Sequence, residues 1–146
     1  MEAIIFIGIQ ATGKSTFYKS RFLHTHVHIN LDKLRTRHRE AIFMSACFST
    51  QMAFAVDNTN PGVEDRKRYI KPALKSGYKV IGYYFQSRLS DSSNRNAERE
   101  VSVPEIALRS TYSKLELPSY SEGYDELWYV QIDESDFTVK AWQDEI

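Results

Sequence analysis

The sequence predicts an α/β fold, a three-layer sandwich built on a mostly parallel sheet of about five strands. Short apolar runs rich in β-branched residues alternate along the chain with helical patterns, and strands separated by helices usually pair in parallel. The first of these runs is apolar throughout, as expected of a strand buried on both faces. The 146 residues suit one domain, which we expect to span residues 1–146.

The chain opens with a predicted strand, a loop and a helix. Ala3–Ile9 is a continuous apolar run interrupted only by Gly8, which favours a buried strand followed by a turn. A helix is then expected from Lys14 to Leu23. Val27–Ile29 is short and β-branched, which is typical of a second strand.

A long helix is predicted next, from Leu31 to about Ser49. Asn30 is a favoured residue for its N-cap. The apolar or small residues of its expected inner face recur at helical spacing: Leu34, Ala41, Ile42, Ser45 and Phe48. Met52–Val56 is the third apolar run and the third expected strand.

The fourth strand follows a helix with clear start and stop signals. Asn60 is predicted to cap that helix, with Pro61 at its first position and Gly77 at its end. Its expected buried stripe consists of Val63, Ile70, Ala73 and Leu74. Tyr78–Phe85 then reads as the fourth strand.

The last third of the chain is less regular. Arg88–Glu100 is polar and helical with hardly an apolar face, and Pro104 opens a helix that reaches about Glu116. Leu127–Ile132 is the fifth expected strand. No structure is predicted for residues 133–146.

Composition limits the kind of protein this is. With 42% hydrophobic and 26% charged residues, the chain can form a globular core, and a formal net charge of zero excludes a strongly basic nucleic-acid binder. The single cysteine, Cys47, predicts no internal disulfide and a buried, inert thiol. The N-terminus lacks the features of a signal peptide and no run is long enough to span a membrane. We therefore expect a cytoplasmic location and no membrane contact.

The segment Gly8-Ile9-Gln10-Ala11-Thr12-Gly13-Lys14-Ser15 matches the P-loop pattern at every fixed position. It follows a predicted strand and opens a predicted helix, which is the context in which backbone N–H groups cradle phosphates. Lys14 is expected to reach the β- and γ-phosphates of ATP, Ser15 to bind Mg²⁺, and Thr16 to contact the α-phosphate. The alternative is a tight strand-to-helix turn. The pattern predicts a P-loop nucleotide-binding fold of the nucleotide-kinase type.

Asp32 and Arg35 follow the second strand, at the edge where α/β sheets bind ligands. At helical spacing they would share a face, with Arg39 one turn further along. A kinase acting on an alcohol benefits from a carboxylate that accepts the hydroxyl proton and from a cation that holds an anionic acceptor. An ordinary helix-terminal Asp–Arg pair is the alternative interpretation.

Two further segments follow strands at the same edge. Asp57 closes an apolar strand, where P-loop proteins place the acid of the Mg²⁺ site, and Asn58 is next to it. Arg95 and Arg99 are four residues apart on the polar helix and could close over ATP as a helical lid. Turn chemistry for the first pair, and a solvated charged helix for the second, remain open.

Together these pieces resemble the kinase domain of the 5′-OH polynucleotide kinases. The similarity rests on four segments in order: residues 8–16, Asp32-x-x-Arg35, Val56-Asp57-Asn58-Thr59-Asn60-Pro61 with Arg66, and Arg95-Asn96-x-x-Arg99. Residues 103–118 and 122–126 are also similar to the C-terminal part of that family's kinase domain. The resemblance implies ATP and Mg²⁺ as cofactors, Asp32 as general base, Arg35 as the group that grips the acceptor phosphate, and lid arginines that act in the transition state.

The acceptor expected from this resemblance is the 5′-hydroxyl end of a single-stranded polynucleotide, RNA or DNA. Arg35, Arg39 and Asn58 would bind it, within a possible basic rim formed by Lys33, Arg35, Arg37, Arg39, Arg66, Lys67, Arg68 and Lys71. Members of the family are often fused to a phosphatase or another end-processing module, which this sequence does not encode, so an end-processing partner protein is possible. A kinase for a sugar, nucleoside or antibiotic remains an alternative, as does a nucleotide-binding module active only within a larger end-repair assembly.

Three histidines alternate along the second strand, as metal ligands on one strand face could. His24, His26 and His28 have no cysteine or acidic residue at a spacing that would complete a metal site. We therefore expect a strand edge that faces water.

Overall fold

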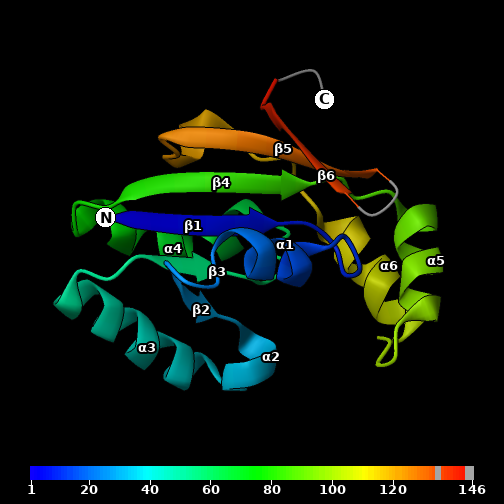
Figure 1. The fold of residues 1–146 in the computed structure, drawn as a ribbon, viewed down its shortest axis with the longest axis horizontal. Helices are drawn as coiled ribbons and strands as arrows, with labels where there is room; N and C mark the ends of the chain where they lie inside the picture. The colour runs from blue at the N-terminus through cyan, green and yellow to red at the C-terminus, as the bar shows by residue number, and fades with distance from the viewer. Residues whose placement is uncertain (134–135, 144–146) are drawn as a thin grey trace.

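The computed structural model describes residues 1–133 and 136–143, and its centre is a six-stranded sheet (Figure 1). The strand order is β2-β3-β1-β4-β5-β6, and all neighbours are parallel except β5 and β6. The strands are β1 (Glu2–Ile7), β2 (Val27–Ile29), β3 (Phe54–Val56), β4 (Lys79–Phe85), β5 (Glu126–Asp133) and β6 (Asp136–Ala141). The predicted α/β class with its mostly parallel sheet is confirmed, with five parallel strands and one added antiparallel strand.

The helices form two layers around this sheet, and a further pair lies beyond its edge. Helix α1 covers one face, while α3 and α4 cover the other. In Figure 1, α5 and α6 lie at the right, past the ends of β1 and β4. None of the helices in the described residues is long and apolar enough to cross a membrane. The helices are α1 (Lys14–Arg21), α2 (Leu31–Leu34), α3 (Arg37–Thr50), α4 (Val63–Lys75), α5 (Leu89–Glu98), α6 (Glu105–Lys114) and a 3₁₀ helix, η1 (Tyr120–Glu122).

Strand β1 explains why two separate cores form. Its side chains alternate between the faces of the sheet, and those from Ala3 to Ile7 are at most 1% exposed. Ile4 and Phe6 pack with Phe17 of α1, whereas Ala3, Ile5 and Ile7 belong to the core formed with α3 and α4. A strand buried on both faces is what its continuous apolar sequence predicted.

The prediction of one long helix from Leu31 to about Ser49 is wrong, because two helices, α2 and α3, form in its place. Arg35 adopts φ 77°, which lies outside the right-handed helical region. Thr36 then caps α3, with its side chain accepting a hydrogen bond from the Arg39 amide at 3.1 Å. Threonine is a favoured N-cap residue, so the sequence did contain a signal for this break.

The start of α4 also differs from the prediction. The N-cap is Gly62, whereas Asn60 is buried with φ 46° and donates from Nδ2 to the Phe6 carbonyl oxygen at 2.8 Å. The chain after β3 is therefore fastened to the end of β1. Gly8 reinforces this connection by donating from its amide to the Thr59 carbonyl oxygen at 3.0 Å. The predicted stop at Gly77 is confirmed, since α4 ends at Lys75.

The buried face of α4 contains a charge that sequence patterning placed on the surface. Arg66 is fully buried, and its guanidinium pairs with Glu122 at 2.7 and 3.1 Å. It also donates to the carbonyl oxygens of Asn60 and Pro61. Arg66 therefore does not belong to a basic rim. The predicted stripe is also partly wrong, since Leu74 is exposed.

We predict that Arg66→Ala lowers the free energy of unfolding by about 3–5 kcal/mol, because it leaves the buried Glu122 carboxylate without its partner. The neighbouring Lys67→Ala is the matched control, since Lys67 pairs with Glu64 on the exposed surface and its loss should leave the unfolding midpoint close to that of the wild type. Urea unfolding measures both. Equal unfolding midpoints for the two variants would contradict this account.

Candidate active site at the carboxyl ends of the parallel strands

A cleft of about 570 Å³ opens where β1 and β3 end. Its walls include residues 10–16 of the P-loop and five of the other predicted site residues: Asp32, Asp57, Asn58, Arg95 and Arg99. At the start of the loop, Ile9 is buried and the Gly8 amide donates to the Thr59 carbonyl oxygen. The topology thus brings together four segments that lie far apart in the sequence, as expected for the carboxyl edge of a parallel sheet.

The loop between β1 and α1 has the tight conformation that its glycines permit. Gly13 has φ 89°, and a Cβ there would lie 2.8 Å from Ile132 and 2.9 Å from Phe137. A larger residue would therefore meet both strain and a steric clash. Ala11 adopts φ 60°, which costs a residue with a Cβ more than it would cost glycine. The loop thus accommodates Ala11 with some backbone strain.

Lys14 is the buried cation of the loop. Its Nζ donates to the carbonyl oxygens of Gly8 at 2.9 Å and Ile9 at 2.6 Å. The pKa of Lys14 is lowered to about 8, chiefly by burial and also by the Arg99 charge, while Asp57 and Asp32 act in the opposite direction. The Lys14 ammonium therefore interacts electrostatically with Asp57, Asp32 and Arg99 of the cleft.

Ser15 and Asp57 form a pair at the base of the cleft. The Ser15 hydroxyl donates to Asp57 Oδ2 at 2.7 Å, and the same oxygen lies 2.8 Å from His28 Nε2. His28 stacks on Tyr18 and its Nδ1 lies 2.9 Å from Lys33 Nζ. The expectation that His28 faces water without an acidic partner is thus wrong, because Asp57, directly after the adjacent strand β3, supplies one.

The residues of this pair fit a magnesium ion. A serine hydroxyl and a carboxylate, already within hydrogen-bond distance, are the hard oxygen donors that Mg²⁺ prefers. Within residues 1–133 and 136–143, no group of three or more His, Cys, Asp or Glu side chains gathers into a metal site. Few protein ligands suit Mg²⁺ at a nucleotide site, because phosphates and water complete its shell.

Helix α2 places Asp32 on the wall of the cleft. The Asn30 side chain accepts from the Lys33 amide and donates to the Asp57 carbonyl oxygen at 2.6 Å. The Leu31 amide donates to Asn58 Oδ1 at 3.0 Å. Asn58, predicted to bind substrate, thus has its side-chain oxygen committed to the backbone of α2.

Arg35 and Arg39 do not share the helix face that the sequence predicted for Asp32. Arg35 follows the last residue of α2 with a positive φ, and Arg39 belongs to α3. Both are exposed and neither lines the cleft. The break at Arg35 is the physical reason, since the spacing argument required one continuous helix.

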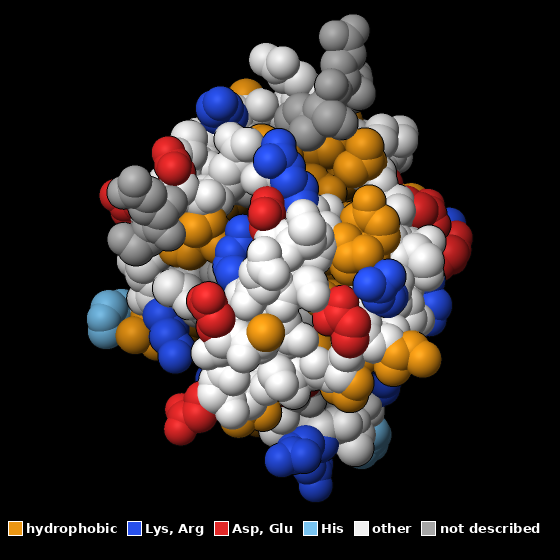
Figure 2. Space-filling view, turned by 90° about the vertical axis from the view of Figure 1, so that its right-hand side faces the viewer, with side chains coloured by type: hydrophobic (Ala, Val, Ile, Leu, Met, Phe, Trp, Pro, Cys, Tyr) orange, Lys and Arg blue, Asp and Glu red, His pale blue; other side chains and the backbone are white. Residues whose placement is uncertain are grey.

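The two lid arginines reach the cleft from the end of α5 and the residue that follows it. Arg95 lies on the helix and donates from Nη1 to the Ala11 carbonyl oxygen at 2.8 Å. Arg99 follows the last helical residue and lines the cleft. Figure 2 looks onto this side of the molecule and shows Lys and Arg side chains scattered among acidic and hydrophobic ones. The cations of the cleft are thus local features and not part of one basic face in this view.

One wall of the cleft is apolar, which the sequence did not predict. Val103, Ile132 and Phe137 line it, and the last two come from β5 and β6. Phe137 lies in the segment for which no structure was predicted. The alternation of Phe137 and Val139 with polar residues was a usable strand signal. Of that segment, residues 134–135 and 144–146 lie outside the described residues.

Comparison with known proteins gives two related curated sequences. No protein-family model matches the chain. A bifunctional polynucleotide phosphatase/kinase of Schizosaccharomyces pombe is 26% identical over 129 residues, covering 84% of this chain and 32% of the relative. A protein of Acanthamoeba polyphaga mimivirus, named for the same two activities, is 28% identical over 135 residues, covering 86% and 32%. The chain therefore spans about a third of the length of these relatives.

Solved structures share the fold. A gluconokinase from Sinorhizobium meliloti has a TM-score of 0.66 at 16% identity, covering 91% of this chain and 83% of its own. A chain of the Pnkp1/Rnl/Hen1 RNA repair complex has a TM-score of 0.64 at 16% identity, covering 78% and 43%. The predicted P-loop fold is therefore confirmed. In sequence, the chain is similar to proteins named bifunctional polynucleotide phosphatase/kinases.

Proposed function

We propose that this chain is an ATP-dependent phosphotransferase that moves the γ-phosphate of ATP to the 5′-hydroxyl end of a polynucleotide. One observation carries the proposal: the P-loop, both carboxylates and both lid arginines line a single cleft. The names of the two sequence relatives support the polynucleotide acceptor. The basic residues at the start of α3 offer contacts for such an acceptor outside the cleft.

The nucleotide half of the cleft is formed by the loop and the lid. Backbone N–H groups of residues 10–16 would surround the phosphates at the start of α1, where the helix dipole favours anions. Lys14 and Arg99 would neutralise the transferring group, and Arg95 would hold the loop. The apolar side chains of Ile132 and Phe137 suit the nucleobase, since ligand sites are mostly apolar with a few placed polar groups.

The acceptor half is formed by Asp32, for which we propose the role of general base. The carboxylate lines the cleft and makes no hydrogen bond within the described residues, so it is free to accept the proton of an incoming hydroxyl. Arg35 and Arg39 would hold phosphates of the acceptor strand from outside the cleft. Ser15 and Asp57 would hold Mg²⁺, whose charge when bound favours the anionic transition state.

Transfer of labelled γ-phosphate to short 5′-hydroxyl RNA and DNA strands tests the proposal. We expect label on 5′-hydroxyl strands and none on strands already phosphorylated at that end. Asp32→Asn should lower the rate by about 10²-fold or more, because general-base catalysis is lost, while ATP binding persists.

Two results would overturn this assignment in different ways. Label on gluconate or a nucleoside, with none on either strand, would favour a small-molecule kinase like the structural neighbour. ATP binding without transfer to any acceptor, with transfer restored by an end-repair protein, would favour a module that works within an assembly.

ATP affinity should depend on pH through Lys14. Its pKa of about 8 leaves it charged at pH 7 and mostly neutral above pH 9. Phosphates favour the charged form, so binding above pH 8 requires proton uptake and the affinity should fall by up to about tenfold per pH unit. Isothermal titration calorimetry from pH 7 to 9.5 measures this. Lys14→Arg keeps its charge at these pH values and should show no such fall, whereas a flat wild-type profile would contradict the prediction.

A further inference from the structure

Glu40 is a buried carboxylate on α3 that the proposed chemistry does not use. Its side chain is 2% exposed. Oε1 accepts a hydrogen bond from Arg37 at 2.9 Å, and Oε2 accepts from the Tyr69 hydroxyl at 3.0 Å and from Asn58 Nδ2 at 3.2 Å. Burying a carboxylate costs free energy even when it is paired. These contacts therefore indicate a role other than stabilising the fold.

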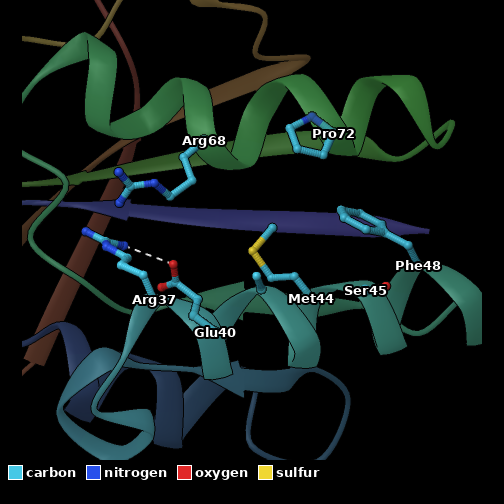
Figure 3. A pocket seen from close by; sticks show the side chains of 8 residues that line it. Arg37, Glu40, Met44, Ser45, Phe48, Arg68 and Pro72 are labelled. Atoms are coloured by element: carbon cyan, nitrogen blue, oxygen red, sulfur yellow. Dashed lines mark hydrogen bonds and ion pairs between the residues drawn. The ribbon is translucent and has the colours of Figure 1, made fainter.

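The carboxylate lies at one end of a cavity of about 430 Å³ between α3 and α4. Figure 3 shows Arg37 and Glu40 facing each other across this end of α3, with Arg68 opposite on α4. Arg37 also donates to the Tyr69 hydroxyl at 2.7 Å. Burial and the Glu40 charge both raise the pKa of Tyr69, so its hydroxyl keeps its proton and remains a donor.

None of the residues of helix α2 is fully buried, and Leu34 at its end is half-buried against the core, so polar contacts hold the start of the helix. It is a single turn, which is too short to be stable alone, and it ends at the positive φ of Arg35. Its fixed points are the Asn30 side chain and the hydrogen bond from the Leu31 amide to Asn58 Oδ1. The position of Asp32 therefore depends on the orientation of the Asn58 amide.

Glu40 determines that orientation. A carboxylate only accepts hydrogen bonds, so the Asn58 NH₂ group must face it and Oδ1 must face the Leu31 amide. If the amide were reversed, one oxygen would face the carboxylate and the NH₂ group would face the Leu31 N–H. Tyr69 alone cannot fix the orientation of the Asn58 amide, because its hydroxyl can both donate and accept hydrogen bonds.

We propose that Glu40 is a positioning residue for phosphoryl transfer. By fixing the Asn58 amide, it holds the first backbone N–H of α2, and with it the Asp32 carboxylate, without contacting ATP or the acceptor. The inference rests on the proposed function only for the role of Asp32.

An exchange of the two side-chain types tests this. In Glu40→Gln, the new NH₂ group must point at another donor, either Arg37 or Asn58, so one hydrogen bond of the wild type is lost. In Asn58→Asp, two carboxylates oppose each other. The double variant Glu40→Gln/Asn58→Asp restores every pairing with the same total charge, since the introduced amide donates to the introduced carboxylate and accepts from Arg37.

We expect each single variant to lower kcat for phosphate transfer at least tenfold while the KM for ATP stays within about twofold. Hydrogen–deuterium exchange of the segment 30–35 should rise in both. The double variant should recover most of kcat and of the protection from exchange. Glu64→Gln, which changes an exposed glutamate on α4, is the matched control and should behave as wild type.

The proposal fails if Glu40→Gln leaves kcat and exchange at residues 30–35 unchanged. It also fails if the double variant is no better than either single variant, or if exchange rises equally throughout the chain, which indicates a role in overall stability only. The exchange experiment needs no acceptor, so it remains decisive even if the wild-type protein phosphorylates no polynucleotide.

Discussion

The parallel pairing of β1 with both β3 and β4 is the constraint on which the rest of the site depends. Both edges of β1 are paired and both of its faces are buried, and the chain continues from its carboxyl end into the P-loop. The segments that follow β3 and β4 leave at the same edge. Asn60 and Gly8 then connect the segment that follows β3 to the end of β1 through one hydrogen bond each. The phosphate loop and Asp57 are therefore neighbours as a consequence of topology, before any of their own contacts form.

Around this edge, polar networks take the place that apolar packing has elsewhere. Arg66 fastens the start of α4 to Glu122 and to two carbonyl oxygens, and Glu40 joins α3 to α4 and to the loop after β3. A surface that must present backbone N–H groups to phosphates cannot also be sealed with apolar side chains. Directed hydrogen bonds position short elements such as α2 without covering them, although each buried charge needs complete pairing to be tolerated.

The contrast between apolar packing in the core and polar networks around the cleft explains what could be predicted from the sequence. The strands and the P-loop follow from local patterns, since a continuous apolar run or a fixed glycine spacing has the same meaning wherever it occurs. Other features depend on partners that are distant in the sequence. Arg66 is buried with a partner 56 positions away, and the partners of Glu40 and His28 are each 29 positions away. A charged residue at such a position is indistinguishable from a surface residue in one sequence. Two misses were local: Thr36 was a readable N-cap, and the alternation around Phe137 was a readable strand.

Under the proposed function, phosphate would replace contacts that the cations of the cleft make within the protein. Lys14 and Arg95 both donate to carbonyl oxygens of the loop, which are weaker partners than an anion. The cations are thus held near their working positions, and the reorganisation on binding is limited to an exchange of acceptors. Nearby Asp57 and Asp32 offset part of the desolvation of Lys14 and keep it charged near neutral pH. Under the proposed function, a chain with a net charge of zero would bind a polyanion through cations that the fold places in the cleft and does not spread over the surface.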